Sequence, residues 1–304
     1  MVKLKGAFGY ASIAFIVIFI VFSDVAALSA LNGMKLCGNV LVPTLFPMMV
    51  LTGIAVRSGV FNALGRIGNR IFKPLFGIDG KYVVSFFIGI LGSAPTGALA
   101  AKNLSSEKDT DGSSSALLLS SVVSFGFIYS VIGIKYLDNA RRGVVLFVFQ
   151  ILSVMITAVF LRPKKRCETK PNDLSVKPEK ISAAVALSIR DAATNMLSVC
   201  GSVIFFSALS GIFVSLPIGE KAKLFLCPFF ELASGLEYIS GRFSPDVTFM
   251  LASSAVGWSG LSMIFQSISV VGGSIPTHKY LLGRALSALI CPLLSLGAIN
   301  LGII

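Results

Sequence analysis

The chain has 304 residues, of which 55% are hydrophobic and 13% are charged. The charged share is about half of that in an ordinary soluble domain, and the mean hydropathy is +0.86. This composition excludes a soluble enzyme, a disordered chain and a secreted disulfide scaffold. It predicts an all-α, polytopic membrane bundle whose apolar exterior is covered by lipid.

The net charge is +12, from 26 Lys and Arg against 14 Asp and Glu. A basic chain can bind nucleic acid, but no basic patch with interleaved aromatic residues is present. Basic residues of membrane proteins gather instead in loops on the cytoplasmic side. We therefore expect the lipid bilayer and a small solute as partners and no nucleic acid. A homo-oligomer or a membrane protein partner stays open.

Cysteine and histidine give no sign of a metal site or a cofactor. The single histidine is His278, and no two cysteines form a CxxC unit. The cysteines read as small buried hydrophobes: Cys37, Cys167, Cys200, Cys227 and Cys291. Motifs for zinc proteases, serine hydrolases and P-loop enzymes are absent from the sequence, so we expect no enzyme.

The first apolar run is Ala7–Phe22, which has the length of a signal-peptide core. Val25–Ala27 would even serve as a cleavage site. Because eight more apolar runs follow, we expect a retained first helix that reaches about Leu28, with Asp24 near its outer end. Residues 1–35 are then an N-terminal transmembrane helix, and cleavage is the alternative.

The later runs include several that are long enough to cross a bilayer as helices. In order they are Leu36–Val56, Tyr82–Ala101, Ala116–Ile134, Gly143–Leu161, Ala192–Ile218, Leu224–Ile239, Val247–Val271 and Tyr280–Ile304. Tyr82–Ala101 and Leu224–Ile239 are broken by Gly, Pro, Ser or Glu. We expect these two to be interrupted or re-entrant.

Between the first two of these runs, Val60–Phe76 predicts an amphipathic helix on the membrane surface. Its apolar residues recur at helical spacing and its basic residues take the other face. The apolar set is Val60, Leu64, Ile67, Ile71 and Leu75, and the polar set is Arg66, Asn69, Arg70 and Lys73.

Three basic segments set the expected topology: Lys3–Lys5, Arg57–Lys81 and Arg162–Lys180. All three should face the cytoplasm, which requires an even number of crossings before Arg162. Five apolar runs lie there, so we expect that Tyr82–Ala101 does not cross. The prediction is a multi-pass protein of the cell membrane with a cytoplasmic N-terminus and an external C-terminus.

The chain also divides into two similar halves, residues 36–161 and 181–304, joined by a basic linker at 162–180. Each half has an apolar helix, two breaks and a closing span. The breaks are Gly92–Gly97 and Ser124–Gly126 in the first half, and Glu231–Gly235 and Gly257–Gly260 in the second. If each half crosses an odd number of times, the repeats are inverted. Matching broken helices in inverted repeats are typical of secondary transporters.

Breaks in membrane helices free backbone groups that lipid cannot satisfy, so the breaks must face protein or a water-filled cavity. The half-helix that follows Pro95 would direct its positive N-terminal end toward such a cavity, which suits an anion. We expect Gly92–Gly97 and Glu231–Gly235 to meet there, near the membrane midplane. The predicted solute-binding residues are Ser93, Pro95, Thr96, Gly97, Ser234, Gly235, Ser259, Gly260, Ser262 and Gln266. Packing kinks and hydrogen bonds between helices are the structural alternatives.

Glu231 is the predicted ion-coupling residue. A carboxylate inside a membrane is costly and usually marks an ion or proton pathway. Its structural alternative is to cap a half-helix by accepting backbone N–H groups freed by the break. Glu237 lies close to Arg242 and reads as interfacial.

Four motifs resemble the sporulation integral membrane proteins, a family with nucleoside-recognition (Gate) domains. They are Leu41–Pro47, which is similar to the family signature VLPSLFP, then Gly92–Ala98, Glu231–Leu236 and Gly260–Ser262 with Gln266. The resemblance runs from about Asn39 to about Leu289. Ser93-Ala94 stands where the family has Gly-Tyr, and Ile264 stands where it has His.

This resemblance implies a transporter or channel for a small organic anion. The expected substrate is dipicolinic acid, moved during spore cortex and core maturation across the membrane that surrounds the forespore. A nucleoside-type solute and a non-transporting structural or gating subunit that needs a partner are the alternatives.

Overall fold

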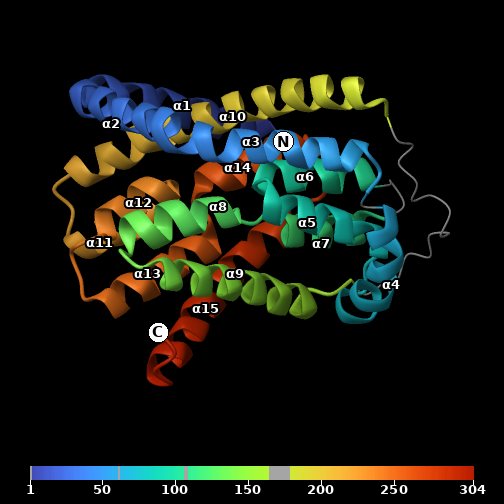
Figure 1. Ribbon diagram of the computed structural model, residues 1–304. Helices are drawn as coiled ribbons and strands as arrows, with labels where there is room; N and C mark the ends of the chain where they lie inside the picture. The colour runs from blue at the N-terminus through green and yellow to red at the C-terminus, as the bar shows by residue number, and fades with distance from the viewer. Residues whose placement is uncertain (1, 61, 106–108, 164–178) are drawn as a thin grey trace.

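The computed structural model describes residues 2–60, 62–105, 109–163 and 179–304 (Figure 1). Every regular element among these residues is helical, which confirms the predicted polytopic helical bundle. Most of the predicted linker, including Cys167, lies outside the described residues. The other four cysteines are free thiols, and three of them, Cys37, Cys227 and Cys291, are buried.

The helices before the linker, in chain order, are α1 (Val2–Val21), α2 (Ser23–Leu36), η1 (Cys37–Leu41), α3 (Val42–Arg57), α4 (Asn62–Phe76), η2 (Gly80–Tyr82), α5 (Val83–Leu91), α6 (Ala94–Leu104), α7 (Thr110–Ser120), α8 (Phe125–Phe127), η3 (Ile128–Tyr136) and α9 (Ala140–Phe160). Those of the second half are α10 (Ile181–Ser215), α11 (Glu220–Phe230), α12 (Leu232–Ile239), α13 (Pro245–Trp258), α14 (Gly260–Val271) and α15 (His278–Asn300).

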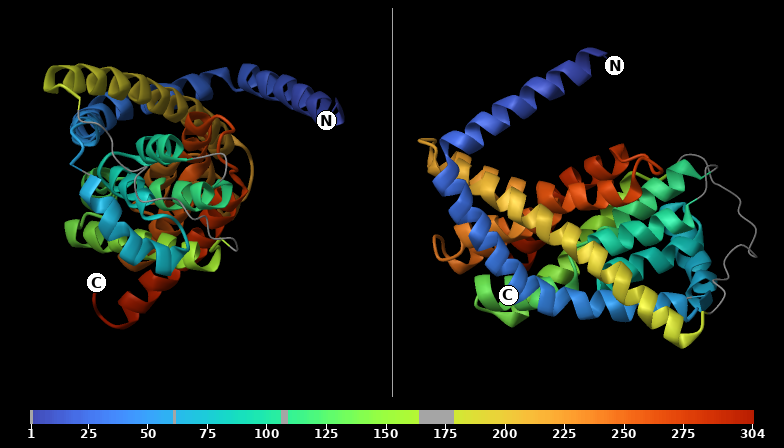
Figure 2. Two further views of the ribbon diagram at one scale, coloured as in Figure 1. Left: turned by 90° about the vertical axis from the view of Figure 1, so that its right-hand side faces the viewer. Right: turned by 90° about the horizontal axis from the view of Figure 1, so that it is seen from above.

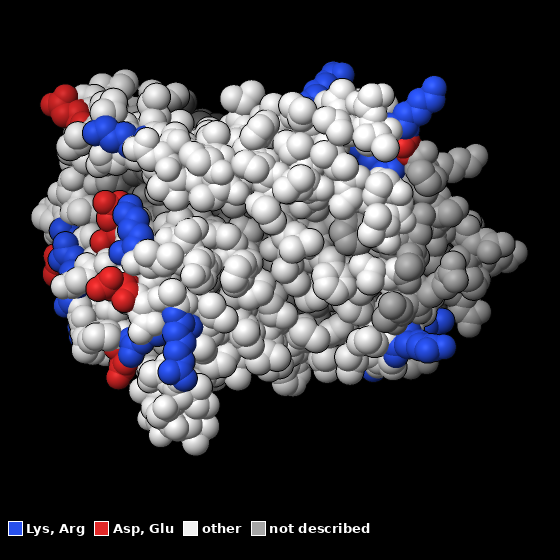
Figure 3. Space-filling model, in the orientation of Figure 1, with Lys and Arg blue, Asp and Glu red and all other residues white. Residues whose placement is uncertain are grey.

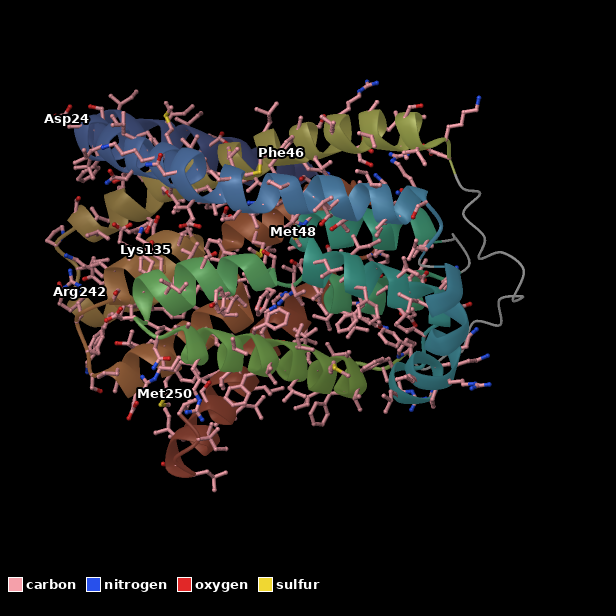
Figure 4. All side chains as sticks on the ribbon, in the orientation of Figure 1. Asp24, Phe46, Met48, Lys135, Arg242 and Met250 are labelled. Carbon is pink, nitrogen blue, oxygen red and sulfur yellow. The ribbon has the colours of Figure 1, made fainter. Side chains whose placement is uncertain are left out.

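An apolar band crosses the face of the bundle that Figure 3 shows. Charged residues gather at the two ends of the long axis, and a band without them lies between (Figure 3). Asp24, Lys135 and Arg242 lie at one end (Figure 4), while α9 ends and α10 begins at the other. Six helical stretches within the described residues are long and apolar enough to cross a membrane: Ser23–Arg57, Thr110–Tyr136, Ala140–Phe160, Ile181–Ser215, Pro245–Val271 and His278–Asn300. The bilayer normal therefore follows the long axis.

The first helix is shorter than predicted. It ends at Val21, and Phe22 leaves helical geometry with φ −105° and ψ 31°. A new helix then begins at Ser23, with Asp24 in its first turn, where a negative charge favours a helix start. The prediction that the first helix continues to Leu28 is therefore wrong. From this bend α1 leaves the bundle at an angle (Figure 2).

The long stretch Ser23–Arg57 packs along α10 through small residues. A Cβ added at Gly53 would lie 2.9 Å from the Cβ of Ser188, and one at Gly33 would lie 3.1 Å from that of Ser207. Close contact of this kind is how membrane helices associate when lipid competes for apolar surface. These two long helices therefore form one tightly packed wall of the bundle.

Each half contains a helical hairpin that does not cross. The chain reverses between α5 and α6, so Tyr82–Ala101 returns to the end from which it entered, as the topology argument predicts. The hairpin of α11 and α12 enters from the opposite end (Figure 1). Leu224–Ile239 is thus the second re-entrant element, broken at Glu231.

Two of the crossing stretches are broken near their middle. Thr110–Tyr136 leaves helical geometry between Ser120 and Phe125, and Pro245–Val271 does so at Ser259. These breaks fall at the two sequence breaks expected from Ser124–Gly126 and Gly257–Gly260. Each half therefore supplies one hairpin and one broken span. Whether the halves are true inverted repeats stays a prediction.

The amphipathic helix forms as α4, at the end where α10 begins (Figure 1). Phe72 and Phe76 are buried, and Phe72 packs edge-on against Phe86 of α5 with ring centroids 5.6 Å apart. Ile71 and Leu75 are exposed. The helix therefore packs on the bundle through its phenylalanines and leaves an apolar strip uncovered, as a surface helix would.

Candidate functional site

A buried cavity of about 50 Å³ lies where the hairpins and the broken spans meet. Among the described residues, its lining is Leu41, Leu45, Ser93, Ala94, Pro95, Val123, Ser124, Phe127, Val199, Val203, Glu231, Leu232, Ala233, Ser259, Ser262, Met263 and Gln266. Both hairpin tips, at residues 93–95 and 231–233, contribute. The expected meeting of the two broken elements at one cavity is therefore what the structure shows. We call this space the central cavity.

Four helix starts point at the central cavity. The residues that precede these helices are Ser93 before α6, Ser124 before α8, Glu231 before α12 and Ser259 before α14, and all four line the cavity. Helix α8 continues directly into η3. Each helix start carries partial positive charge from its unpaired N–H groups. The cavity is thus lined by four helix starts and by no Lys or Arg among the described lining residues.

Ser93 and Thr96 hold the first hairpin tip. Their hydroxyl oxygens lie 3.2 Å apart, and Thr96 Oγ1 donates to the Ser93 carbonyl at 2.8 Å. Pro95 occupies the first turn of α6, where its missing N–H costs nothing because that group would be unpaired. Sequence motif and geometry therefore agree on why the helix restarts here.

Glu231 both caps α12 and lines the central cavity. One of its carboxylate oxygens accepts the backbone N–H of Ser234 at 2.5 Å, and the residue is 4% exposed. It is the one ionisable side chain among the described lining residues. Glu231 therefore caps the half-helix, as the structural alternative from the sequence proposes. Its position at the cavity also suits ion coupling.

Ser259 stores strain at the second break. Its φ is +76°, a left-handed conformation that costs a non-glycine residue about 1–3 kcal/mol. Such strain clusters at functional sites. Further along α14, Gln266 donates to the Ser262 hydroxyl at 3.2 Å, so these two lining side chains are linked to each other.

Five predicted site residues do not line the central cavity. Gly97 packs against backbone, since an added Cβ would lie 2.1 Å from the Ser120 carbonyl oxygen. A Cβ added at Gly235 would likewise lie 2.2 Å from the Cα of Pro228 in α11. These glycines allow helices to approach closely, and their role here is in packing.

The other three have identifiable roles. Gly260 has a φ of +74°, and its added Cβ would lie 2.9 Å from the backbone nitrogen of Leu232, so it lets α14 begin beside the second hairpin tip. The Ser234 hydroxyl is 3.0 Å from that of Ser207 and ties α12 to α10. Thr96 lines a second cavity instead.

This second cavity, about 310 Å³, lies between α3, α5, α6 and α10. Arg57 stands at its edge and forms ion pairs with Glu179 at 2.9 Å and Asp191 at 2.5 Å. The adjacent Arg190-Asp191 pair at the start of an apolar run predicts a solvated interfacial site, and Asp191 is indeed half exposed while it also pairs with Arg57 of another helix. We call this space the vestibule, because it reaches from the end with the ion pairs to Thr96 on the first hairpin.

Sequence reasoning missed Ser124 as a lining residue, although it stands at a recognised break. The signal was available, because a Ser directly before a new helical run is a preferred N-cap. Leu41 and Leu45 were also missed as lining residues, yet they lie within the Leu41–Pro47 motif. Among the described residues no group of three metal-ligating side chains gathers.

Comparison with known proteins gives one family match. Residues 38–138 match the Gate family, described as nucleoside recognition. The match covers about a third of the chain and includes Ser93 and Ser124 of the central cavity. No curated protein and no solved structure matches the chain. Apolar spans and this match together describe a multi-pass membrane protein with a region similar to the Gate domain.

Proposed function

We propose that this protein is a membrane transporter or channel for a small organic anion, with dipicolinic acid as its substrate. The observation that carries the proposal is the convergence of four helix starts on one buried cavity. Broken helices whose positive ends face a site in the bundle are how transporters hold anionic groups. Dipicolinate is a planar dicarboxylate, so it offers two negative groups to these ends.

The layout of the two halves supports alternating access. The hairpins enter from opposite ends (Figure 1), and each half places one hairpin cap and one broken-span cap at the cavity. Ser93 corresponds in position to Glu231, and Ser124 to Ser259. Inverted repeats around a fixed site support rocking of one half against the other.

The sizes of the two cavities support a conformation in which the central cavity is closed and the vestibule gives a path toward it from one end of the bundle. The central cavity has room for a few water molecules and not for an aromatic dicarboxylate. The vestibule is about 310 Å³ and ends at Thr96, next to the first hairpin tip. In this proposal the solute enters the vestibule, and a movement of the α5–α6 hairpin opens the central cavity.

Glu231 supplies the coupling step of the proposal. A permanent negative charge at the cavity would repel a dicarboxylate. A proton or sodium ion bound there would remove the repulsion, so substrate and ion would bind together. The sequence resemblance further implies a role in sporulation and residence in the cell membrane around the forespore. The basic segments favour a cytoplasmic N-terminus, and the sequence motifs favour no enzymatic activity.

A nucleoside-type solute is the second candidate, favoured by the nucleoside-recognition match over residues 38–138. Aromatic rings and hydroxyls would then pair with Ser93, Ser262 and Gln266 in place of carboxylates. Purified protein in liposomes separates these candidates through uptake of labelled dipicolinate against labelled uridine. Flux of dipicolinate supports the first candidate and flux of uridine the second. Flux of neither means that the protein alone is a structural or gating subunit.

A further inference from the structure

Arg284 is a fully buried cation in the second turn of the last span. Its exposed fraction is 0%, and all three guanidinium nitrogens lack a hydrogen-bond partner among the described residues. The residue lies in α15, inside the candidate span His278–Asn300. A charge inside a membrane protein is costly unless it is paired, and it usually marks a functional site.

No acid on the neighbouring helices is available to pair with it. Helix α15 packs against α13, α9 and α7. Helix α9 carries no Asp or Glu, and the single acids of α7 and α13 are Asp111 and Asp246. Asp111 pairs with Lys279 at 2.8 Å, and Asp246 pairs with Arg142 at 2.5 Å. The counter-charge of Arg284 is therefore not among these helices.

A second donor stands on the same face of α15. Tyr280 precedes Arg284 by one turn, is also 0% exposed, and its hydroxyl has no hydrogen-bond partner among the described residues. The guanidinium carbon lies 5.5 Å from the centroid of the Tyr280 ring. Phenol and guanidinium together offer O–H and N–H donors, the set that binds a halide or a carboxylate.

The position of this pair connects it with the helix breaks. Gly283 packs against Leu118 in the last turns of α7, and Ser287 packs against Gly257 near the end of α13. Both α7 and α13 stop at breaks whose far sides line the central cavity. Arg284 therefore lies on a helix turn held between the ends of the two broken spans.

We propose that Arg284 and Tyr280 form a binding site for one small anion, a halide or a carboxylate. The bound anion would neutralise the guanidinium and fix the two breaks against α15. This site is separate from the central cavity, since neither residue lines it. It also lies outside the residues 38–138 that match the Gate family.

The test uses the purified full chain in a nonionic detergent, with sodium isethionate as the bulky reference salt. Isethionate is replaced stepwise by chloride, or by acetate, at constant ionic strength. The thermal unfolding midpoint of the wild type should rise by about 5 °C at saturation, because the anion binds the folded state. A response to chloride alone assigns the site to an inorganic anion. A response to acetate assigns it to a carboxylate, the group that a transported solute would carry.

Matched variants locate the effect. Arg284→Met should abolish the anion response, Arg284→Lys should retain a weaker one, and Tyr280→Phe should raise the anion concentration for half-maximal response several-fold. Lys279→Met, which removes a neighbouring cation already paired with Asp111, should respond like the wild type. An unresponsive wild type, or an undiminished response in Arg284→Met, would overturn the proposal.

A second measurement needs no variant. The single tryptophan, Trp258, follows Gly257, which packs against Ser287. Bromide should quench Trp258 fluorescence saturably, and chloride or acetate should reverse the quenching. Purely linear quenching that neither anion reverses would contradict the site. Both measurements detect anion binding and do not require transport. Their outcome therefore tests this site independently of the proposed transport function.

Discussion

The carboxylate of Glu231 accepts the backbone N–H of Ser234 at 2.5 Å and at the same time lines the central cavity. One side chain thus starts helix α12 and places an ionisable group at the site. The two roles can be separated by substitution, because a glutamine retains the accepting oxygen and loses the charge.

Glu231→Gln should fold with nearly unchanged stability and bind the solute without a co-bound ion. Solute flux in liposomes should then no longer depend on an imposed proton or sodium gradient. Glu231→Ala is the matched control for capping, and it should lose about 1 kcal/mol of stability with the N-cap. Flux in Glu231→Gln that keeps the wild-type ion dependence would leave Glu231 as a structural cap alone.

Gly260 should be intolerant of any side chain. Gly260→Ala adds a Cβ at φ +74° and places it 2.9 Å from the backbone nitrogen of Leu232. The conformational cost is about 1–2 kcal/mol, and the second hairpin tip must shift. Gly297→Ala in α15 is the control, since nothing lies within 4 Å of its added Cβ. Thermal unfolding of both variants tests this, and equal stabilities would contradict the proposed contact.

The linker should face the cytoplasm. The end of α9 and the start of α10, which the linker joins, lie at the end of the bundle opposite to Arg242 (Figures 1 and 4), and Cys167 lies within the linker sequence. An impermeant maleimide should label Cys167 only after the cells are permeabilised. Ser244→Cys, an exposed position two residues from Arg242, should be labelled in intact cells. Labelling of Cys167 in intact cells would reverse the topology.

Acid should weaken the end of the bundle that holds the second hairpin. Tyr238 donates a hydrogen bond to Glu220 at 2.5 Å, and this bond, with help from Lys223 and Arg242, holds the pKa of Glu220 below its usual range. Burial and the same bond raise the pKa of Tyr238 to about 12. A depressed carboxyl pKa contributes stability that is present above its unfolded value and is lost as pH falls through its folded value.

Tyr238→Phe should therefore be less stable than the wild type at pH 7. The difference should shrink as the pH falls from the usual glutamate pKa of about 4.3 toward the lower pKa of Glu220 in the folded protein. Unfolding midpoints of both proteins across this range give the measurement. A difference that stays constant with pH would show that the tyrosine hydroxyl stabilises the hairpin without acting on the carboxylate.

The sequence alone was enough to predict the helical class and the two re-entrant hairpins. Of the eleven site residues proposed from it, six line the central cavity. Gly, Pro and Ser in an apolar run signal a break directly, because lipid cannot satisfy the freed backbone groups. The roles of Gly97, Gly235 and Gly260 could not be read this way. Their role depends on which backbone lies opposite, and that is set by tertiary packing.

Arg284 illustrates the opposite case. A basic residue within an apolar run is a visible signal, yet its meaning depends on pairing. The sequence offers acids in several helices, and the structure shows that Asp111 and Asp246 pair elsewhere. The bend at Phe22 was likewise hidden, because the residues on both sides of it are compatible with helix.

The central claim is that the solute binds in the cavity where the hairpin tips meet. It is tested most directly with Ser124→Cys in a variant without the five native cysteines, reacted with a small methanethiosulfonate reagent. Dipicolinate should slow this reaction in a saturable way, and a cysteine at Ser244 should react at the same rate with or without it. If dipicolinate and uridine both leave the rate at residue 124 unchanged while the purified protein still transports either one, the central cavity is not the binding site.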